Sequence, residues 1–199
     1  LEQVIARRRS RRNYTGEALD LRDVATLLRG SVGVTGHMEV PRASGDTVRY
    51  NLRAVPSGGG LYPVSLFMAV LRVDGLDRGV YRYAPLLDRL VPVAGERGCQ
   101  DVRSALAGDL AVEQSDAAGA HLVFVISPWR SMRKYGPRGL RFTLQEVGAV
   151  AQQINLICTS LGLASVESSS FYEDELNQAL NLDGTFETAT HTMTVGVEA

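Results

Sequence analysis

A cluster of arginines near the start of the chain is the strongest signal for an anion-binding site. The segment RRRSRRNY covers residues 7–14 and places five arginines within six positions. Five adjacent cations repel one another unless a phosphate, solvent or an acidic surface neutralises them. A phosphate would do so well, because guanidinium groups bind its oxygens bidentately and the hydroxyl of Ser10 adds a neutral donor. A solvated helix end and a nucleic-acid contact are the alternatives for this cluster.

Lys134 is the second chemical signal, because it is the only lysine among 21 basic residues. It lies in WRSMRKYGPRGLRF, residues 129–142, which we expect to form a polar loop. A lysine can lose its proton when it is desolvated or placed among other cations, here Arg133 and Arg138, whereas arginine stays charged. Lys134 is therefore a candidate general base, and adjacent Tyr135 is a candidate acid, base or orienting hydroxyl. The alternative is a surface lysine with no chemical role.

The glycine-rich segment RAVPSGGGLYP, residues 53–63, is the third signal. Consecutive glycines allow the backbone to approach a planar or anionic ligand and to present N–H donors. No GK[ST] follows, so the segment is not a Walker loop, and it lacks the GxGxxG spacing of a dinucleotide-binding fold. A flexible turn between two elements is the alternative.

The histidines and cysteines form no motif. His37, His121 and His191 show no GxSxG or HExxH pattern and no clustered acidic partners, so a histidine-based mechanism is not expected. Cys99 and Cys158 form no CxxC pair, so neither a disulfide framework nor a zinc site is indicated. We expect no metal.

Length and composition define the setting for these residues. The 199 residues suffice for one compact domain, residues 1–199, whose core needs no metal or disulfide. The formal charge is only -1, so no overall field would recruit nucleic acid or a membrane surface, and any anion site must be local. The apolar runs are too short to span a bilayer and no signal segment opens the chain, which favours a cytoplasmic protein.

Periodicity and capping signals predict the elements that must position these residues. Asp20 is expected to begin a helix that ends at Gly30, and Thr143 with Glu146 forms a capping box for a core helix that ends at Gly162. Residues 31–51 show no clear period and are expected to form a long excursion. Further helices are expected at residues 1–9, 101–110 and 173–180, and strands at residues 65–73, 79–83, 89–93, 121–127 and 192–197. This order indicates an α+β fold that contains a β-meander.

Four ordered motifs resemble the nitroreductase superfamily, and most closely its SagB-type (McbC-like) branch. They are RRSRRNY, PSGGGLYP, GVYRYAP and RKYGPRGLRF running into LQEVGAVAQQINLICTSLGLA. The resemblance implies a nitroreductase-like FMN-binding fold of the α+β class, with a central mixed β-sheet flanked by helices. It also implies an intertwined homodimer with two FMN sites at the subunit interface. That branch oxidises peptide thiazolines and oxazolines to thiazoles and oxazoles in natural product biosynthesis.

The resemblance also implies roles for individual residues. The phosphate-binding motif of the superfamily falls on Arg8, Ser10 and Arg12. The Lys-Tyr pair that distinguishes the azoline-oxidising branch falls on Lys134 and Tyr135, in agreement with the independent argument for the lone lysine.

Two further segments are expected to contact FMN. The PSG segment would line the flavin from the partner subunit, and it falls on Pro56, Ser57 and Gly58, with Gly59 beside them. The segment VESSSF resembles the place where backbone N–H groups approach flavin N5, with serines in place of the usual glycine. The residues concerned are Glu167, Ser168 and Ser169.

The expected enzyme is therefore an FMN-dependent azoline dehydrogenase whose peptide substrate is delivered by a leader peptide or a carrier protein. A general NAD(P)H-dependent nitroreductase or quinone reductase is one alternative, because it shares the flavin site and needs no Lys-Tyr pair. A non-catalytic scaffold subunit of a peptide-modifying complex is the other. The natural product, the ring heteroatom and the terminal electron acceptor stay open. Because the chain begins at Leu1, the choice between a stand-alone enzyme and a domain of a larger synthetase also stays open.

Overall fold

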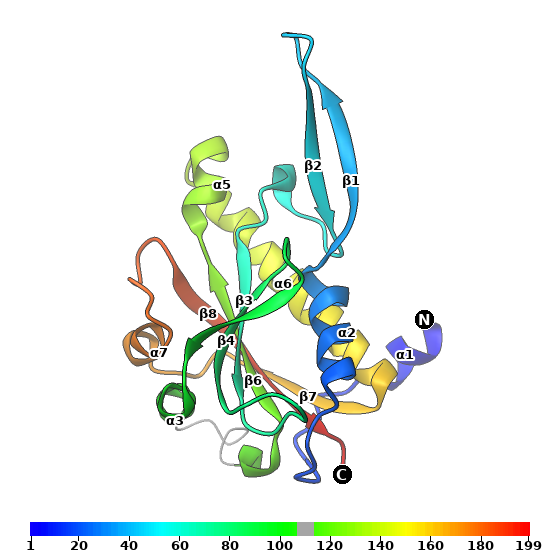
Figure 1. Ribbon diagram of the computed structural model, residues 1–199, viewed down its shortest axis with the longest axis vertical. Helices are drawn as coiled ribbons and strands as arrows, with labels where there is room; N and C mark the ends of the chain where they lie inside the picture. Colours follow the sequence, from blue (N-terminus) through cyan, green and yellow to red (C-terminus); the bar gives the residue numbers. More distant parts are fainter. Residues whose placement is uncertain (107–113) are drawn as a thin grey trace.

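An antiparallel sheet forms the centre of the computed structural model, which describes residues 1–106 and 114–199 (Figure 1). Its six strands lie in the order β5-β4-β3-β6-β8-β7. The strands are β3 (Val64–Val70), β4 (Gly79–Ala84), β5 (Arg89–Ala94), β6 (Ala120–Ile126), β7 (Leu163–Ser168) and β8 (Thr188–Val197). The α+β fold and the meander β3-β4-β5 are confirmed. The expected mixed sheet was wrong, because every neighbouring pair of these strands runs antiparallel.

The two central strands are apolar on both faces. Every residue of β6, AHLVFVI, is buried, and β3 reads VSLFMAV. Helices therefore cover both faces of the sheet (Figure 1). One face packs against α2 (Leu21–Val32) and α6 (Arg138–Leu161), and the other against α3 (Glu96–Ala105) and α7 (Glu173–Ala179). Phe124 and Val123, neighbours on β6, belong to the two separate cores.

The core helix α6 begins one turn earlier than its capping signal predicts. Thr143 is not the cap: it lies inside the helix, where its hydroxyl donates to the carbonyl of Gly139 at 3.1 Å. The added turn packs closely on α5 (Pro128–Tyr135), because a Cβ at Gly139 would lie 2.5 Å from the carbonyl carbon of Ser131. The predicted end at Gly162 is confirmed, and its φ of 74° is the left-handed conformation that glycine adopts readily.

The segment that we expected to be a polar loop contains the helix α5. Pro128 occupies its first turn, where the missing N–H costs nothing, and Gly136 follows its last residue. The loop prediction was wrong because many arginines conceal an amphipathic pattern in which Ser131 is buried against α6. Lys134 and Tyr135 therefore lie in the last turn of a helix, which fixes their relative positions.

The N-terminal helices are α1 (Glu2–Arg7) and α2. Asp20 caps α2 as predicted, accepting the N–H of Arg22 at 2.7 Å. The predicted stop at Gly30 was wrong, because α2 continues to Val32. Gly30 serves packing instead: a Cβ there would lie 2.7 Å from Cδ1 of Ile157 on α6.

Residues 31–51 form no irregular excursion. They complete α2 and then form most of a hairpin of β1 (Val34–Pro41) and β2 (Thr47–Arg53), which projects from the body of the molecule (Figure 1). Met38 pairs with Tyr50 and Val40 with Val48, so these apolar side chains share one face of the hairpin. Met38 and Tyr50 are exposed in the single chain. The periodicity was missed because glycines and charges interrupt it.

The remaining elements agree with the predictions only in part. α3 begins five residues before the predicted start at residue 101, and residues 107–110 of that prediction lie outside the described residues. α7 is confirmed, and β7 is a strand that we did not predict. Short 3-10 segments are η1 (Gly58–Gly60) and η2 (Gln114–Ala117). None of the described helices is both long and apolar enough to cross a membrane.

Candidate functional site

The glycine segment and the Lys-Tyr pair, 75 residues apart in sequence, meet in the structure. Gly59 lies in η1 with a φ of 69°, against the last turn of α5. A Cβ at Gly59 would collide with the hydroxyl of Tyr135 and would lie 2.9 Å from Nζ of Lys134. The missing side chain at Gly59 is therefore what allows the two polar groups to approach this backbone.

The side chains of Lys134 and Tyr135 differ in packing and exposure. The ring of Tyr135 packs edge-on against Phe142 of α6, with 5.1 Å between the ring centroids, so its orientation is fixed. The amine of Lys134 lies 5.3 Å from the centroid of that ring and is exposed. In the described part of the chain Lys134 forms no ion pair. The amine is thus held beside the Tyr135 side chain and has no carboxylate partner among the described residues.

Hydrogen bonds fix the backbone that leads away from Gly59. The hydroxyl of Ser57 accepts the N–H of Tyr62 at 2.8 Å, and the hydroxyl of Tyr62 accepts the N–H of Arg53 at 3.0 Å. Arg130 of α5 donates to the carbonyl oxygen of Tyr62 at 3.1 Å. The loop is therefore tied both to itself and to the helix that carries Lys134.

A buried carboxylate, Glu146 of α6, lies beneath this loop. Only 4% of Glu146 is exposed, and one of its oxygens has no hydrogen-bond partner among the described residues. Burial raises the pKa of Glu146 above its usual range, while hydrogen bonds from Ser57 and Val64 and the charges of Arg53 and Arg130 oppose this shift. We predicted Glu146 only as a capping residue, a role that the start of α6 at Arg138 excludes. Residues 57–62, 134, 135 and 146 are called the glycine-loop group below.

A second group of side chains gathers where β7 ends beside β8. His191 lies between two partners: its Nε2 is 2.9 Å from a carboxylate oxygen of Glu167, and its Nδ1 is 2.9 Å from the hydroxyl of Ser169. The other carboxylate oxygen of Glu167 accepts a hydrogen bond from Asn155 of α6. The hydrogen bond with His191 holds the pKa of Glu167 below its usual range, and the charge of Arg8 acts in the same direction. We call residues 8, 155, 167, 169 and 191 the strand-end group.

The strand-end group corrects the prediction about histidine. The sequence showed no acidic partner for His191, yet Glu167 is one, because antiparallel pairing of β7 and β8 brings together residues that are 24 positions apart. The recurring alternation of polar and apolar residues in β8, THTMTV, is the signal that could have placed His191 beside another strand.

Some arginines of the cluster bind other groups of the protein, and others form no ion pair among the described residues. Arg11 forms an ion pair with Glu198, and Arg9 donates to backbone carbonyls of its own helix end. Arg12 and Ser10 are exposed, and Arg8 is half-buried beside Glu167. Arg8 and Arg12 form no ion pair among the residues that the structure describes. They can therefore bind an external anion.

No hydrogen bond or ion pair between described residues joins the two groups within one chain. Both are carried by α6, whose Glu146 supports the loop and whose Asn155 holds Glu167. These two positions lie nine residues apart, which is about 14 Å along a helix. Pro56 and Ser168, the other expected contacts, lie at the borders of the two groups: Ser168 accepts a hydrogen bond from Thr192 at its carbonyl.

The donor set fits a phosphorylated planar ligand. Arg8, Ser10 and Arg12 offer cationic and neutral donors for a phosphate, and the glycines offer an open backbone for a flat ring. A Cβ at Gly60 would meet nothing within 4 Å, so space is present above η1. The described residues contain no group of His, Cys, Asp and Glu that suits a metal ion.

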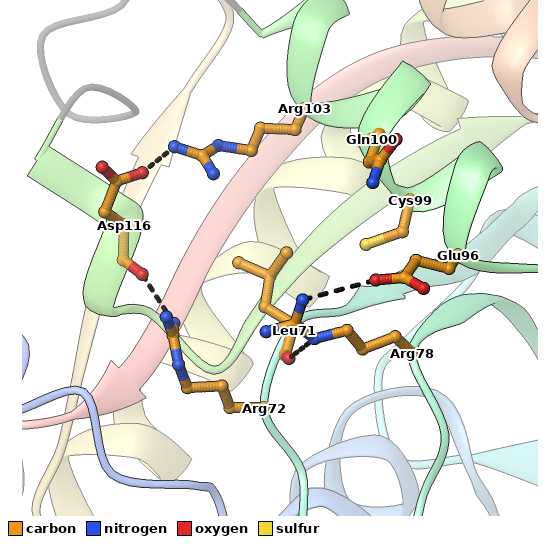
Figure 2. A pocket seen from close by; sticks show the side chains of 8 residues that line it. All are labelled: Leu71, Arg72, Arg78, Glu96, Cys99, Gln100, Arg103 and Asp116. Carbon is orange, nitrogen blue, oxygen red and sulfur yellow. Dashed lines mark hydrogen bonds and ion pairs between the residues drawn. The ribbon is translucent and has the colours of Figure 1, made fainter.

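A separate cavity of about 140 Å³ lies at the opposite end of the sheet and is lined by three arginines (Figure 2). Its guanidinium groups already have partners. Arg72 donates to the carbonyl of Asp116, Arg78 pairs with Glu96, and Arg103 pairs with the carboxylate of Asp116. Because each of these guanidinium groups already has a partner inside the protein, the cavity is a weaker candidate than the two groups above.

The chain is similar in sequence and in structure to known proteins. The model of a protein family described as "Nitroreductase family" matches residues 5–197. MJ1384 of Methanocaldococcus jannaschii, which is named as a nitroreductase, is 35% identical over 184 residues, or 92% of this chain and 84% of that protein. The microcin B17-processing protein McbC of Escherichia coli is 32% identical over 135 residues, or 66% of this chain and 49% of McbC.

Two solved structures extend the comparison. A chain of the E. coli microcin synthetase McbBCD complex with truncated pro-MccB17 matches 94% of this chain and 67% of its own length, with a TM-score of 0.74 and 24% identity. A nitroreductase-like protein from Desulfovibrio desulfuricans, solved in complex with FMN, matches the whole chain and 86% of its own length, with a TM-score of 0.62 and 17% identity. At these identities the two structures support the fold.

Proposed function

This chain belongs to the nitroreductase family and is an oxidoreductase, and from that premise we propose that it is an FMN-dependent azoline dehydrogenase of the SagB-type branch. Its substrates would be peptide thiazolines or oxazolines, which it would oxidise to thiazoles or oxazoles. The observation that carries the proposal is the contact of Lys134 and Tyr135 with Gly59. A general flavin reductase has no use for an amine and a phenol held against its flavin loop.

FMN is the proposed cofactor. Arg8, Ser10 and Arg12 would hold its phosphate, and the backbone of Glu167, Ser168 and Ser169 would face its ring. When bound, FMN supplies a ring that accepts a hydride from the substrate. The role of His191 and Asn155 would be to hold Glu167 in place. The structural neighbour that was solved in complex with FMN supports the choice of FMN as the cofactor.

Lys134 would act as the base. Aromatising an azoline removes one hydride and one proton, so the protein must place a proton acceptor beside the ring carbon. The exposed amine of Lys134 would accept this proton. The ring of Tyr135, fixed against Phe142, would direct its hydroxyl toward the substrate.

A homodimer would complete the site. In the proposed dimer, Pro56, Ser57, Gly58 and Gly59 of one subunit line the FMN held by the partner's arginines. This arrangement would explain why the two groups do not touch within one chain. Exposed Leu140 and Leu144 lie one turn apart on α6, so they form an apolar strip that a second copy could cover.

A peptide carried by a leader segment or a carrier protein is the proposed form of the substrate. The similarity to McbC, named as a microcin-processing protein, and to a chain of a complex with bound pro-MccB17 supports a peptide. A second candidate function is NAD(P)H-dependent nitroreduction, which the 35% identity to MJ1384 favours.

Anaerobic mixing would separate these two functions. FMN-loaded protein is mixed either with a thiazoline peptide or with NADPH, and the flavin absorbance is followed. The proposed function predicts that the peptide bleaches the flavin and yields the thiazole, with NADPH reacting far more slowly. Rapid bleaching by NADPH and none by the peptide would support the nitroreductase and contradict the dehydrogenase.

A further inference from the structure

An exposed aromatic hollow lies beside the Lys-Tyr pair. Trp129 and Met132 of α5 face Phe186 from the segment before β8, and the rings of Trp129 and Phe186 are 5.9 Å apart. Together with Arg130 and Arg133 they line an open hollow of about 630 Å³. Trp129 is 49% exposed and Phe186 is 61% exposed, and such large apolar surfaces are costly to leave in water.

Phe186 is held in this exposed position by a rigid backbone. One carboxylate oxygen of Asp183 accepts the N–H groups of Thr185, Phe186 and Glu187 at 2.8, 2.6 and 3.1 Å. The carboxylate of Glu187 then accepts a hydrogen bond from Ser127, directly before α5, at 3.1 Å. Here the fold fixes the ring outward, and a surface fixed before binding loses less entropy when it binds.

The hollow is continuous with the glycine-loop group. Arg130 lines the hollow and also donates to the carbonyl of Tyr62 in the glycine loop. Lys134 lies four residues after Arg130 and therefore one turn along the same helix. A chain that places a ring next to the amine of Lys134 can extend across Arg130 into the hollow.

Positive charge predominates on the α5 side of the hollow. Residues 128–145 contain four arginines and Lys134 but no acidic residue. The two carboxylates nearest in sequence to Phe186 are occupied: Asp183 binds backbone N–H groups, and Glu187 binds Ser127 and Arg82. Arg133 has no ion-pair partner in the described residues. The surface therefore complements a carboxylate as well as an apolar side chain.

We infer that this hollow binds the part of the peptide substrate next to the azoline ring, and that it selects an aromatic or large aliphatic side chain accompanied by a carboxylate. The inference rests on the proposed function, because it names the substrate segment that the same site would take. A second copy of this chain is the other candidate occupant. The cationic rim and the continuity with Lys134 favour the peptide.

The single tryptophan makes the inference directly measurable. Two synthetic thiazoline hexapeptides are compared, one with Phe and Asp beside the ring and one with Ser at both places. Each is titrated into FMN-loaded protein while Trp129 fluorescence is recorded, and dehydrogenation is followed by mass spectrometry. The inference predicts a saturable fluorescence change for the Phe-Asp peptide at about tenfold lower concentration than for the Ser peptide.

Phe186→Ala tests the hollow itself, and Leu87→Ala is its control. Both side chains are 61% exposed, and Leu87 lies in the turn between β4 and β5, outside the hollow. Phe186→Ala should raise the KM for the Phe-Asp peptide about tenfold with kcat nearly unchanged and should abolish the preference over the Ser peptide. Leu87→Ala should behave as the wild type.

The outcomes separate this inference from the proposed function. Dehydrogenation with equal KM for both peptides, unchanged by Phe186→Ala, would overturn the inference and leave the function in place. Selective binding of the Phe-Asp peptide without loss of hydrogen would support the hollow and contradict the function. Protection of Trp129 from acrylamide quenching in a peptide-free dimer would show that a second copy covers the hollow and would overturn the inference.

Discussion

The two groups of the candidate site treat their carboxylates in opposite ways. In the glycine-loop group, burial raises the pKa of Glu146, and one oxygen of this carboxylate lacks a partner among the described residues. In the strand-end group, His191 and Asn155 bind both oxygens of Glu167, and its pKa is lowered. The carboxylate of the strand-end group is thus fully hydrogen-bonded, and Arg8 of that group stays available to a cofactor phosphate. The glycine-loop group leaves an amine unpaired and is suited to chemistry.

Removal of Lys134 should give the largest effect and would test the chemical role of the glycine-loop group. Lys134→Ala should lower turnover of a thiazoline peptide by about a hundredfold to ten-thousandfold, because a positioned base is lost. Bound FMN, measured by absorbance of the purified protein, should be unchanged. Lys134→Arg keeps the positive charge but cannot give up its proton, so it should be similarly impaired. Wild-type turnover in either variant would remove Lys134 from the mechanism.

Loss of Arg8 and Arg12 should weaken the retention of FMN, which is the role proposed for the strand-end side of the site. Arg8→Ala combined with Arg12→Ala should raise the Kd for FMN by about a hundredfold, because two charge-assisted contacts to a phosphate are lost. Titration of apoprotein with FMN, followed by quenching of flavin fluorescence, measures this change.

Arg9→Ala is the matched control for the arginine prediction. It removes the same charge from the same cluster, but Arg9 binds carbonyls of its own helix end. We expect its effect on the Kd to be about threefold or less. Equal weakening by Arg9→Ala and by the double variant would mean that only the overall charge matters, which would contradict the assigned contacts.

Gly59→Ala would test how closely the loop must approach Lys134 and Tyr135. Both Gly59 and Gly60 have positive φ, at 69° and 66°, so alanine strains the backbone at either position. Only at Gly59 does the added Cβ meet Tyr135 and Lys134. Gly59→Ala should cost about 1–3 kcal/mol of unfolding free energy, and Gly60→Ala about 1 kcal/mol.

Turnover separates the two glycine variants further. Gly59→Ala should reduce turnover about tenfold or more, because Tyr135 must move, and Gly60→Ala should lose much less. Urea unfolding and peptide turnover, measured on both variants, check this expectation. Equal turnover losses would indicate backbone strain as the cause and would contradict a special role for the contact at Gly59.

The pH dependence of stability should give the smallest effect and compares the carboxylates directly. A raised pKa means that Glu146 contributes stability below its ordinary pKa of 4.5, which is lost as the pH rises through the higher folded value. A lowered pKa means that Glu167 contributes stability above 4.5, which is lost as the pH falls through the lower folded value. The contributions of Glu146 and Glu167 to stability thus change in opposite directions with pH.

Glutamine variants of Glu146 and Glu167 would reveal these opposite pH dependences of stability. Relative to the wild type, Glu146→Gln should gain stability as the pH rises from 4.5 through the raised folded pKa of Glu146. Glu167→Gln should lose stability relative to the wild type as the pH rises through the lowered folded pKa of Glu167 toward 4.5. Urea unfolding at a series of pH values measures both. Parallel curves for the two variants would contradict the opposite environments of the two carboxylates.

The glycine-loop group could be predicted in large part from the sequence. A lone lysine and a run of glycines are local signals, and they pointed to Lys134 and Gly59 before any contact was known. Their meeting is set by α5, which sequence reasoning missed because charged residues hide its amphipathic pattern. Glu146 fitted a capping box after Thr143, but the packing of Gly139 on Ser131 extends the helix and gives Glu146 a different role.

The strand-end group could be predicted only in part. Its backbone segment followed from the family resemblance, but His191 and Asn155 did not. Their contacts with Glu167 depend on the register of β7 with β8 and on the packing of α6 across β7, which are long-range properties. The single-sequence signal for β7 is weak because half of LASVES is polar. Charge pairing across strands therefore became visible only in three dimensions.

Mass spectrometry of a thiazoline peptide tests the central claim most directly. The peptide is incubated with FMN-loaded protein in air, in parallel with Lys134→Ala carrying the same amount of FMN. We predict that the wild type lowers the peptide mass by two hydrogens per ring and that the variant does so at least a hundredfold more slowly, as expected for loss of a general base. An unchanged peptide mass with flavin-loaded wild type, or equal conversion by both proteins, would contradict the account.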